Sequence, residues 1–220
     1  MFSSAALHWI AAITMLIDHI GAFVFLGEYP ELRAIGRIAF PIYALMIAEG
    51  VRHTRSRKKY LLRVFCLALI SQIPIFLISL QLGAKLPINI LFGFALAIIS
   101  LYCIHWGWRG VLIAILATVV AELSGIDYGA LTVLMPVLFY LSMQAKSLPI
   151  RILGCAGTVI LAIAILSYSH PWFATPYVIL AMPFVCLYSG KKGSLAAPRW
   201  IRYAFYPVHL FAIAAVLWLN

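Results

Sequence analysis

Nine long apolar segments, separated by short polar stretches, run through the chain and leave few folds open to it. Of the 220 residues, 65% are hydrophobic and only 10% are charged, which is more apolar sequence than a water-soluble core uses. The segments do not alternate polar and apolar residues as the strands of a membrane barrel do. We therefore predict an all-α, polytopic transmembrane bundle that forms a single domain over residues 1–220. The expected spans are roughly 5–26, 34–51, 62–82, 88–105, 109–124, 129–143, 150–168, 172–188 and 203–219.

The distribution of basic residues predicts an orientation in the membrane. If the N-terminus faces the cytoplasm, 13 of the 16 Lys and Arg residues fall in cytoplasmic loops, and only Arg33, Arg37 and Lys85 fall on the other side. The positive-inside rule then predicts a cytoplasmic N-terminus and an external C-terminus. We interpret the net charge of +10 as this topology signal. A multi-pass protein of the cell (inner) membrane is expected, with membrane lipid around it and no nucleic-acid partner.

The first apolar segment contains two ionisable residues where a lipid-facing helix should hold only hydrocarbon. Asp18 and His19 stand in the run 15–21 (MLIDHIG), and an ionisable side chain at bilayer depth costs a few kcal/mol to insert. Adjacent helical positions lie about 100° apart, so both side chains are able to face one interior sector. A carboxylate beside an imidazole is a common means of orienting a general base. We expect either an acid–base pair in a polar cavity or a polar pair that holds helices together.

The second apolar segment opens with Arg33 and Arg37, and Arg37 falls inside the expected outer leaflet. By the helical rise, Arg37 lies about 5 Å along its helix, and Asp18 lies about 12 Å below the outer end of its own helix. A flexible Arg closes most of that gap. Arg37 is therefore expected either to be a counter-ion that keeps Asp18 ionised or to snorkel to the outer headgroups. Pro41 lacks an N–H group and is expected to kink this helix.

The polar stretch after the second segment is densely basic, with six Lys and Arg residues within the twelve positions 52–63. Glu49 faces Arg52 and His53 at i+3 and i+4, so it is able to orient them. Such a cluster is by default a topology determinant that attracts anionic lipid. The alternative is a site for the phosphates of an anionic cytosolic ligand, bound by Arg forks. The candidate residues are Glu49, Arg52, His53, Arg55, Arg57, Lys58, Lys59, Tyr60 and Arg63.

Three further polar residues fall within or at the start of apolar segments. Gln72 precedes Pro74 near mid-membrane, and Asn89 begins the fourth segment; each is expected to form an interhelical hydrogen bond or to contribute to a site. In the last segment His209 follows Pro207, which is expected to break the helix locally and to direct the imidazole inward. Ionisable residues thus gather on the first three segments and the last one.

Seven short stretches together carry a family resemblance. They are 15–21 (MLIDHIG), 36–41 (GRIAFP), Glu49-Gly50 with His53-Thr54, Lys59-Tyr60 with Arg63, 71–74 (SQIP), 89–92 (NILF) and 206–210 (YPVHL). At these residues the chain resembles the TraX family, membrane proteins associated with N-terminal acetylation of conjugative pilin. The stretches cover most of the first hundred residues and the last segment, whereas residues 95–200 match only in hydropathy. The resemblance does not fix the acceptor, because relatives also occur outside conjugation systems.

The resemblance implies acyl transfer from acetyl-coenzyme A, as in the wider set of membrane acyltransferases that includes the lysosomal glucosaminide N-acetyltransferase. Acetyl-coenzyme A would be the co-substrate, with no metal, and the basic residues of 52–63 would hold its phosphates. Its thioester would reach the bundle interior between Gln72, His209 and His19. The acceptor would be a pilin-like membrane protein or a small amine or hydroxyl compound on the outer side.

Within this hypothesis each polar residue has a role. His19 would take a proton from the acceptor, Asp18 would orient the imidazole and Arg37 would tune the carboxylate. An amide of Gln72 or Asn89 would donate to the thioester oxyanion. Direct transfer and an acyl-His intermediate are both compatible with these residue types.

Two hypotheses from other functional classes remain open. A transporter or channel would use Asp18, His19 and Arg37 as a proton relay, because such proteins also keep ionisable residues near the midplane. It would have no need of the basic cluster as a coenzyme A site, which separates the two hypotheses. A non-catalytic assembly factor would use every polar residue only to hold helices together.

Overall fold

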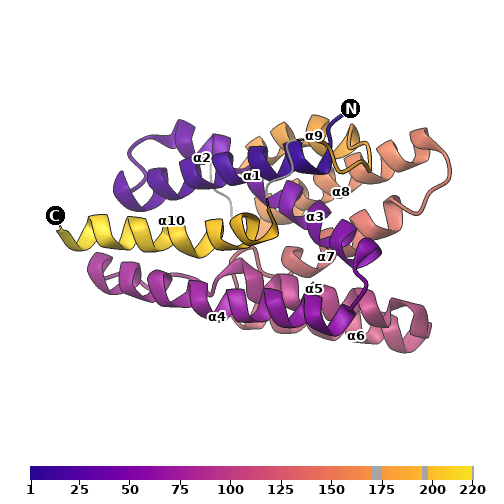
Figure 1. The fold of residues 1–220 in the computed structure, drawn as a ribbon, viewed down its shortest axis with the longest axis horizontal. Coiled ribbons are helices and arrows are strands. Elements are labelled where there is room, and N and C mark those ends of the chain that lie inside the picture. The colour runs from indigo at the N-terminus through magenta and orange to yellow at the C-terminus, as the bar shows by residue number, and fades with distance from the viewer. Residues whose placement is uncertain (170–174, 195–197, 220) are drawn as a thin grey trace. The chain divides into compact units, whose positions relative to one another are not determined.

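The computed structural model describes residues 1–169, 175–194 and 198–219, and each expected apolar span is helical over most of its described residues (Figure 1). Within them, five helical stretches are long and apolar enough to cross a membrane: Ser4–Val24, Pro30–His53, Arg57–Leu82, Leu148–Tyr168 and Trp200–Leu219. Shorter apolar helices cover Ile90–Trp106, Leu131–Ser142 and Thr175–Cys186. The predicted all-α membrane bundle is therefore confirmed. Residues 172–174 of the eighth expected span lie outside the described part of the chain.

The elements follow one another as a series of helices with short connections. They are α1 (Ser4–His19), the π-helix η1 (Ile20–Val24), α2 (Pro30–Gly36), α3 (Ala39–His53), α4 (Arg57–Leu82), α5 (Ile90–Cys103), the 3₁₀-helix η2 (Ile104–Trp106), α6 (Trp108–Leu123), α7 (Leu131–Ser142), α8 (Leu148–Ser169), the 3₁₀-helix η3 (Thr175–Ala181), α9 (Met182–Cys186) and α10 (Arg199–Leu219).

These elements form two compact units. The first unit consists of Met1–Tyr43 and Ser142–Asn220, so it unites the two ends of the chain, and the second consists of Ala44–Leu141. The chain passes from the first unit to the second within α3. That residues 1–220 act as one domain stays a prediction.

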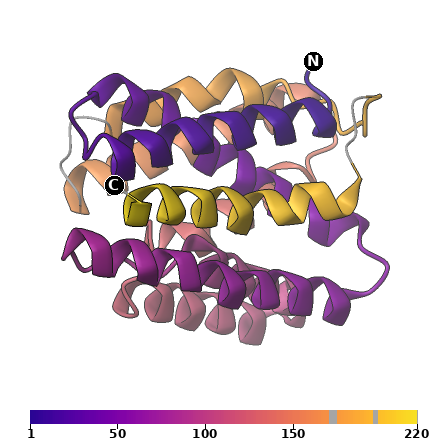
Figure 2. The ribbon, with the colours of Figure 1, turned by 60° about the vertical axis from the view of Figure 1, so that its left-hand side comes forward.

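In the first unit, α1 and α10 run side by side in the same direction (Figure 2). The start of α1 is capped by Ser3, whose Oγ accepts a hydrogen bond from the N–H of Ala6 at 3.2 Å. The N–H groups of Ser4 and Ala5 donate to the carbonyls of Lys191 and Lys192 at 2.8 and 3.0 Å. These bonds attach the first turn of α1 to the segment that precedes α10.

The second expected span is interrupted rather than merely bent. Helix α2 ends at Gly36, Arg37 follows as its C-cap, and α3 begins at Ala39. Pro41 explains the position of the break, because it has no N–H to donate to the carbonyl of Arg37 in a continuous helix. In the first turn of α3 the missing N–H removes no hydrogen bond, because the first N–H groups of a helix have no acceptor within it. The kink expected from Pro41 is thus found as a break in the helix at Arg37, four residues before the proline.

In the second unit, α5 packs against both α4 and α6. Helix α4 begins at Arg57, five residues before the expected start, because Ser56 caps it by accepting from the N–H of Lys59 at 3.4 Å. It continues through Pro74 and ends at Gly83, whose φ of +60° suits a residue without a Cβ. The basic stretch is therefore partly helical, which fixes the spacing of its side chains.

Candidate functional site

Helix α1 ends at His19, and the two ionisable residues at its end point to different neighbours. The α-helix passes into the π-helix η1 at Ile20, a local change of hydrogen bonding that is frequent at functional sites. Because adjacent helical side chains diverge by about 100°, Asp18 meets α2 while His19 meets α10. The end of α1 thus presents a carboxylate on one side and an imidazole on another.

The carboxylate of Asp18 is held by two arginines. Nη1 of Arg33 lies 2.6 Å from Oδ2, and Nη2 of Arg37 lies 2.9 Å from Oδ1. Arg33 also donates to the backbone carbonyl of Asp18 at 3.0 Å, and Nε of Arg37 donates to the carbonyl of Arg33 at 3.3 Å. The three side chains are only 11–18% exposed. This cluster clamps the end of α1 onto α2, with one positive charge in excess.

Two glycines permit α1 and α2 to approach closely enough for this cluster. A Cβ at Gly36 would overlap the side chain of Asp18, and a Cβ at Gly21 would come within 2.7 Å of the Cβ of Leu32. Neither glycine has a positive φ, so the reason for glycine at both positions is space rather than backbone conformation.

The imidazole of His19 is hydrogen-bonded to that of His209. Nδ1 of His19 lies 2.7 Å from Nε2 of His209, and the two rings are nearly parallel, with an interplanar angle of 14°. Nδ1 of His209 lies 2.7 Å from the carbonyl oxygen of Phe205 on its own helix. Helix α10 is continuous through Pro207, so the local break expected there is not found, although the imidazole does point to α1.

These bonds determine which ring nitrogens carry hydrogen when both rings are neutral. A carbonyl oxygen only accepts, so Nδ1 of His209 must be the donor to Phe205 and its Nε2 must be an acceptor. Nδ1 of His19 then donates to that Nε2. The lone pair of His19 is consequently on Nε2, the nitrogen that does not bind His209. The backbone of α10 thereby sets the tautomer of a residue on α1.

The two imidazoles differ in accessibility. His209 is buried, with 6% of its surface exposed, whereas His19 is only part-buried. Aromatic rings surround the pair: Phe23 lies 5.6 Å from the His19 ring between centroids, and Tyr206 stands edge-on to His19 at 6.2 Å. His19 is therefore the member of the pair able to meet a substrate, and His209 is the member behind it.

The structure assigns some of the expected partners differently. Arg37 does neutralise Asp18, as one of its two expected roles requires. Asp18, however, does not orient His19, because its two oxygens bind Arg33 and Arg37 and the orienting residue is His209. Arg33 was not among the expected site residues. Its position four residues before Arg37, on the same helical face, is the signal that would have identified it.

The basic residues of 52–63 lie at the surface of the second unit, and all six Lys and Arg side chains are exposed. The expected pairing of Glu49 is confirmed: Oε1 lies 3.1 Å from Nε2 of His53, and Oε2 lies 3.7 Å from Nη1 of Arg52. Tyr60 is instead buried and lies against Gly50, where a Cβ would overlap its hydroxyl. Tyr60 on α4 therefore packs against Gly50 on α3 and holds the two helices together beside the turn that joins them.

Gln72 and Asn89 bind each other. Oε1 of Gln72 accepts from both the N–H and Nδ2 of Asn89, at 3.0 and 2.8 Å, and Nδ2 also donates to the carbonyl of Ala68 at 2.8 Å. Oδ1 of Asn89 caps α5 through the N–H of Leu91. Both amide hydrogens of Asn89 are thus committed, which excludes it as the expected donor to an oxyanion in this conformation.

A cavity of about 810 Å³ lies in the second unit beside this pair. Lys58 lies at one end, and Gln72 lies fourteen residues later on α4, about 21 Å along the helix by its rise. The wall between them is apolar, and the lining includes Leu61, Leu62, Phe65, Phe92 and Leu96. Its size is within the range of small-molecule sites.

A family model described as TraX protein matches residues 3–217. A relative from Dichelobacter nodosus named probable fimbrial assembly protein FimC, serogroup H1, is 30% identical over 95% of this chain and 93% of its own length. No solved structure matches the chain. Because the family model covers nearly the whole sequence, the chain belongs to the TraX family.

Proposed function

We propose that this protein is an integral membrane acyltransferase that transfers acetyl from cytosolic acetyl-coenzyme A to an amine or hydroxyl acceptor on the outer side of the membrane. The observation that carries the proposal is the His19–His209 pair, a part-exposed imidazole whose tautomer is set by a buried one. The fimbrial assembly name of the relative favours a pilin-like acceptor, as does membership of the TraX family. The cell (inner) membrane is the proposed location.

His19 is the proposed general base. Its Nε2 takes the proton of the acceptor as the acceptor nitrogen or oxygen bonds to the acetyl carbon, and the bond from that carbon to sulfur breaks. The proton then leaves His19 for the departing thiolate of coenzyme A. While His19 is charged, its Nδ1–H donates a charge-assisted hydrogen bond to His209. An acyl-His19 intermediate uses the same lone pair and gives the same products.

Asp18 is a positioning residue in this proposal. Its ion pairs with Arg33 and Arg37 fix the last turn of α1, from which His19 projects. A base must be held within hydrogen-bond reach of the proton that it removes, so movement of this turn lowers the rate even with His19 intact.

The basic stretch 52–63 is the proposed site for the phosphates of acetyl-coenzyme A. Its exposed Arg52, Arg55 and Arg63 provide the planar donors that bind phosphate oxygens, and Lys58 leads into the 810 Å³ cavity. The cavity extends to Gln72 and is long enough along α4 to take an extended pantetheine arm. Acetyl-coenzyme A supplies the activated acetyl group.

The direct test is acetyl transfer by the purified full chain in lipid vesicles, with labelled acetyl-coenzyme A and a peptide that bears a free α-amino group. Time-dependent labelling of the peptide supports the proposal. Binding of acetyl-coenzyme A without labelling of an amine or hydroxyl acceptor contradicts catalysis, and the absence of any binding contradicts the donor assignment.

A further inference from the structure

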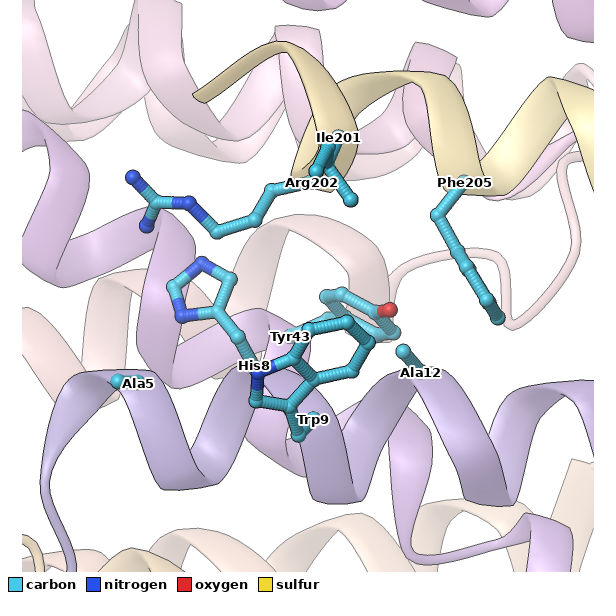
Figure 3. A pocket seen from close by; sticks show the side chains of 8 residues that line it. All are labelled: Ala5, His8, Trp9, Ala12, Tyr43, Ile201, Arg202 and Phe205. Atoms are coloured by element: carbon cyan, nitrogen blue, oxygen red, sulfur yellow. The ribbon is translucent and has the colours of Figure 1, made fainter. Parts of the chain in front are cut away.

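A smaller pocket lies in the first unit, between the beginning of α1 and the beginning of α10 (Figure 3). Its volume is about 30 Å³, room for about two water molecules. His8, Tyr43 and Arg202 are its polar residues, and Trp9 and Phe205 are its aromatic walls. Figure 3 shows the guanidinium of Arg202 beside the imidazole of His8.

Among the residues that the structure describes, no carboxylate forms an ion pair with Arg202. Its Nε is buried and has no hydrogen-bond acceptor among the described residues. The first unit contains three acidic residues, Asp18, Glu28 and Glu31. Asp18 is already bound by two arginines and lies ten residues from His8, about 15 Å along α1. The side chain of Arg202 is only part-buried, but its Nε is a buried donor without an acceptor among the described residues, which is costly and favours binding of an anion in the pocket.

The surroundings of the pocket favour an anion of more than one charge. The backbone bonds from Ser4 and Ala5 bring Lys191 and Lys192, both exposed, to the first turn of α1, and Ala5 lines the pocket. No Asp or Glu occurs anywhere in 142–220. Several cations without a neighbouring carboxylate match a phosphate group better than a single carboxylate does.

His8 adds a directional contact. Its Nδ1 lies 2.7 Å from the carbonyl of Ser4, so that nitrogen donates within the helix and Nε2 remains for a ligand. A neutral His8 accepts from a protonated phosphate oxygen, while the Arg202 guanidinium donates to the unprotonated oxygens. The small volume, room for about two water-sized atoms, limits the enclosed part of the ligand to some of the oxygens of one phosphate group.

We propose that the pocket formed by His8, Tyr43 and Arg202 binds one phosphate group, whose remaining substituents lie outside the pocket near Lys191 and Lys192. The site is distinct from the basic stretch 52–63 of the second unit and does not depend on the proposed acetyl transfer. The phosphate belongs either to a lipid headgroup or to a soluble phosphate compound, and the same contacts serve both.

The test is the thermal unfolding midpoint of the purified full chain. One arm adds inorganic phosphate to the protein in neutral detergent. The other compares nanodiscs of phosphatidylcholine with nanodiscs that also contain phosphatidylglycerol. The variants are Arg202→Met, Arg202→Lys and His8→Gln, with Lys146→Met as the control that removes an exposed charge from the same unit.

We expect the phosphate added in at least one of the two arms to raise the unfolding midpoint of the wild type. It should raise the midpoint of Lys146→Met by the same amount. Without phosphate, Arg202→Met should be at least as stable as the wild type, because it removes a part-buried cation whose Nε has no hydrogen-bond acceptor among the described residues. Its apparent affinity for the stabilising phosphate should fall on the order of tenfold or more, with smaller losses for Arg202→Lys and His8→Gln. A response only in phosphatidylglycerol identifies a lipid headgroup, and a response only to inorganic phosphate identifies a soluble ligand.

The proposal is overturned if neither arm stabilises the wild type more than Arg202→Met. It is also overturned if Arg202→Met unfolds the protein without phosphate while His8→Gln and Arg202→Lys respond like the wild type, because Arg202 would then have only a structural role.

Discussion

His19 and His209 are 190 positions apart in the chain, yet their ring nitrogens lie 2.7 Å apart. The contact exists because α1 and α10, from opposite ends of the sequence, pack side by side in one unit. The Phe205 carbonyl fixes His209, and His209 fixes His19. The orientation of the proposed base therefore depends on α10.

Replacing Asp18 with Asn should destabilise the protein. The change leaves Arg33 and Arg37 part-buried without their shared counter-charge, and breaking a buried ion pair costs about 3–5 kcal/mol. Urea unfolding in mild detergent measures the effect. The double variant Asp18→Asn/Arg33→Gln should recover part of the loss, because it removes one of the stranded charges. Equal stability of Asp18→Asn and wild type would show that the cluster does not clamp α1 to α2.

Gly36→Ala should disturb the same cluster without removing any charge. A Cβ at this position overlaps the Asp18 side chain, so α1 and α2 must separate or the carboxylate must move. A lower unfolding midpoint and slower acetyl transfer are expected. Gly157→Ala is the matched control, because a Cβ there meets nothing within 4 Å. The account of helix packing is wrong if the two alanine variants behave alike.

The triple variant Arg52→Gln, Arg55→Gln and Arg63→Gln should bind acetyl-coenzyme A on the order of tenfold more weakly or worse, since each arginine is expected to donate to phosphate. Equilibrium binding in detergent measures this. A control with the same loss of charge replaces Lys85, Arg109 and Lys146, which are also exposed, with Gln. If both triple variants keep the wild-type affinity, the basic stretch serves only topology.

The C-terminus should face away from the cytoplasm. A reporter that works only outside the cytoplasm should be active when fused after Asn220 and silent when inserted between Lys192 and Gly193. The positive-inside distribution of Lys and Arg is the reason for this expectation. The reverse pattern of activity would overturn the two-sided mechanism, in which donor and acceptor approach from opposite sides.

Hydropathy was sufficient to predict the helices because burial in lipid requires long apolar runs whatever their partners are. It did not predict helix starts equally well. Arg57–Leu61 are helical because Ser56 caps α4, and a cap is a local hydrogen bond that hydropathy does not register. The break at Arg37 follows from Pro41, but the sequence alone predicted only a kink.

The sequence predicted some of the contacts in the candidate site, including the pairing of Arg37 with Asp18 as one alternative, but it did not predict the part of Arg33. Helical periodicity placed Glu49 beside Arg52 and His53 because these contacts lie within one helix. It could not assign Asp18 to Arg33 or His19 to His209, because those pairs depend on how separate helices pack. Of the two roles expected for Asn89, the structure shows the interhelical hydrogen bond, because both of its amide hydrogens bind groups on α4.

The central claim is that Nε2 of His19 is the base for acetyl transfer. The measurement is the initial rate of peptide acetylation by His19→Gln in lipid vesicles, with acetyl-coenzyme A affinity and helical content recorded on the same preparation. Loss of a positioned base typically costs 10²–10⁴-fold in rate, so the account predicts a loss in that range with affinity and helicity unchanged. His209→Gln, whose side-chain oxygen still accepts from Nδ1 of His19, should lose less. Near-normal acetylation by His19→Gln would contradict the account and make His209 the better candidate.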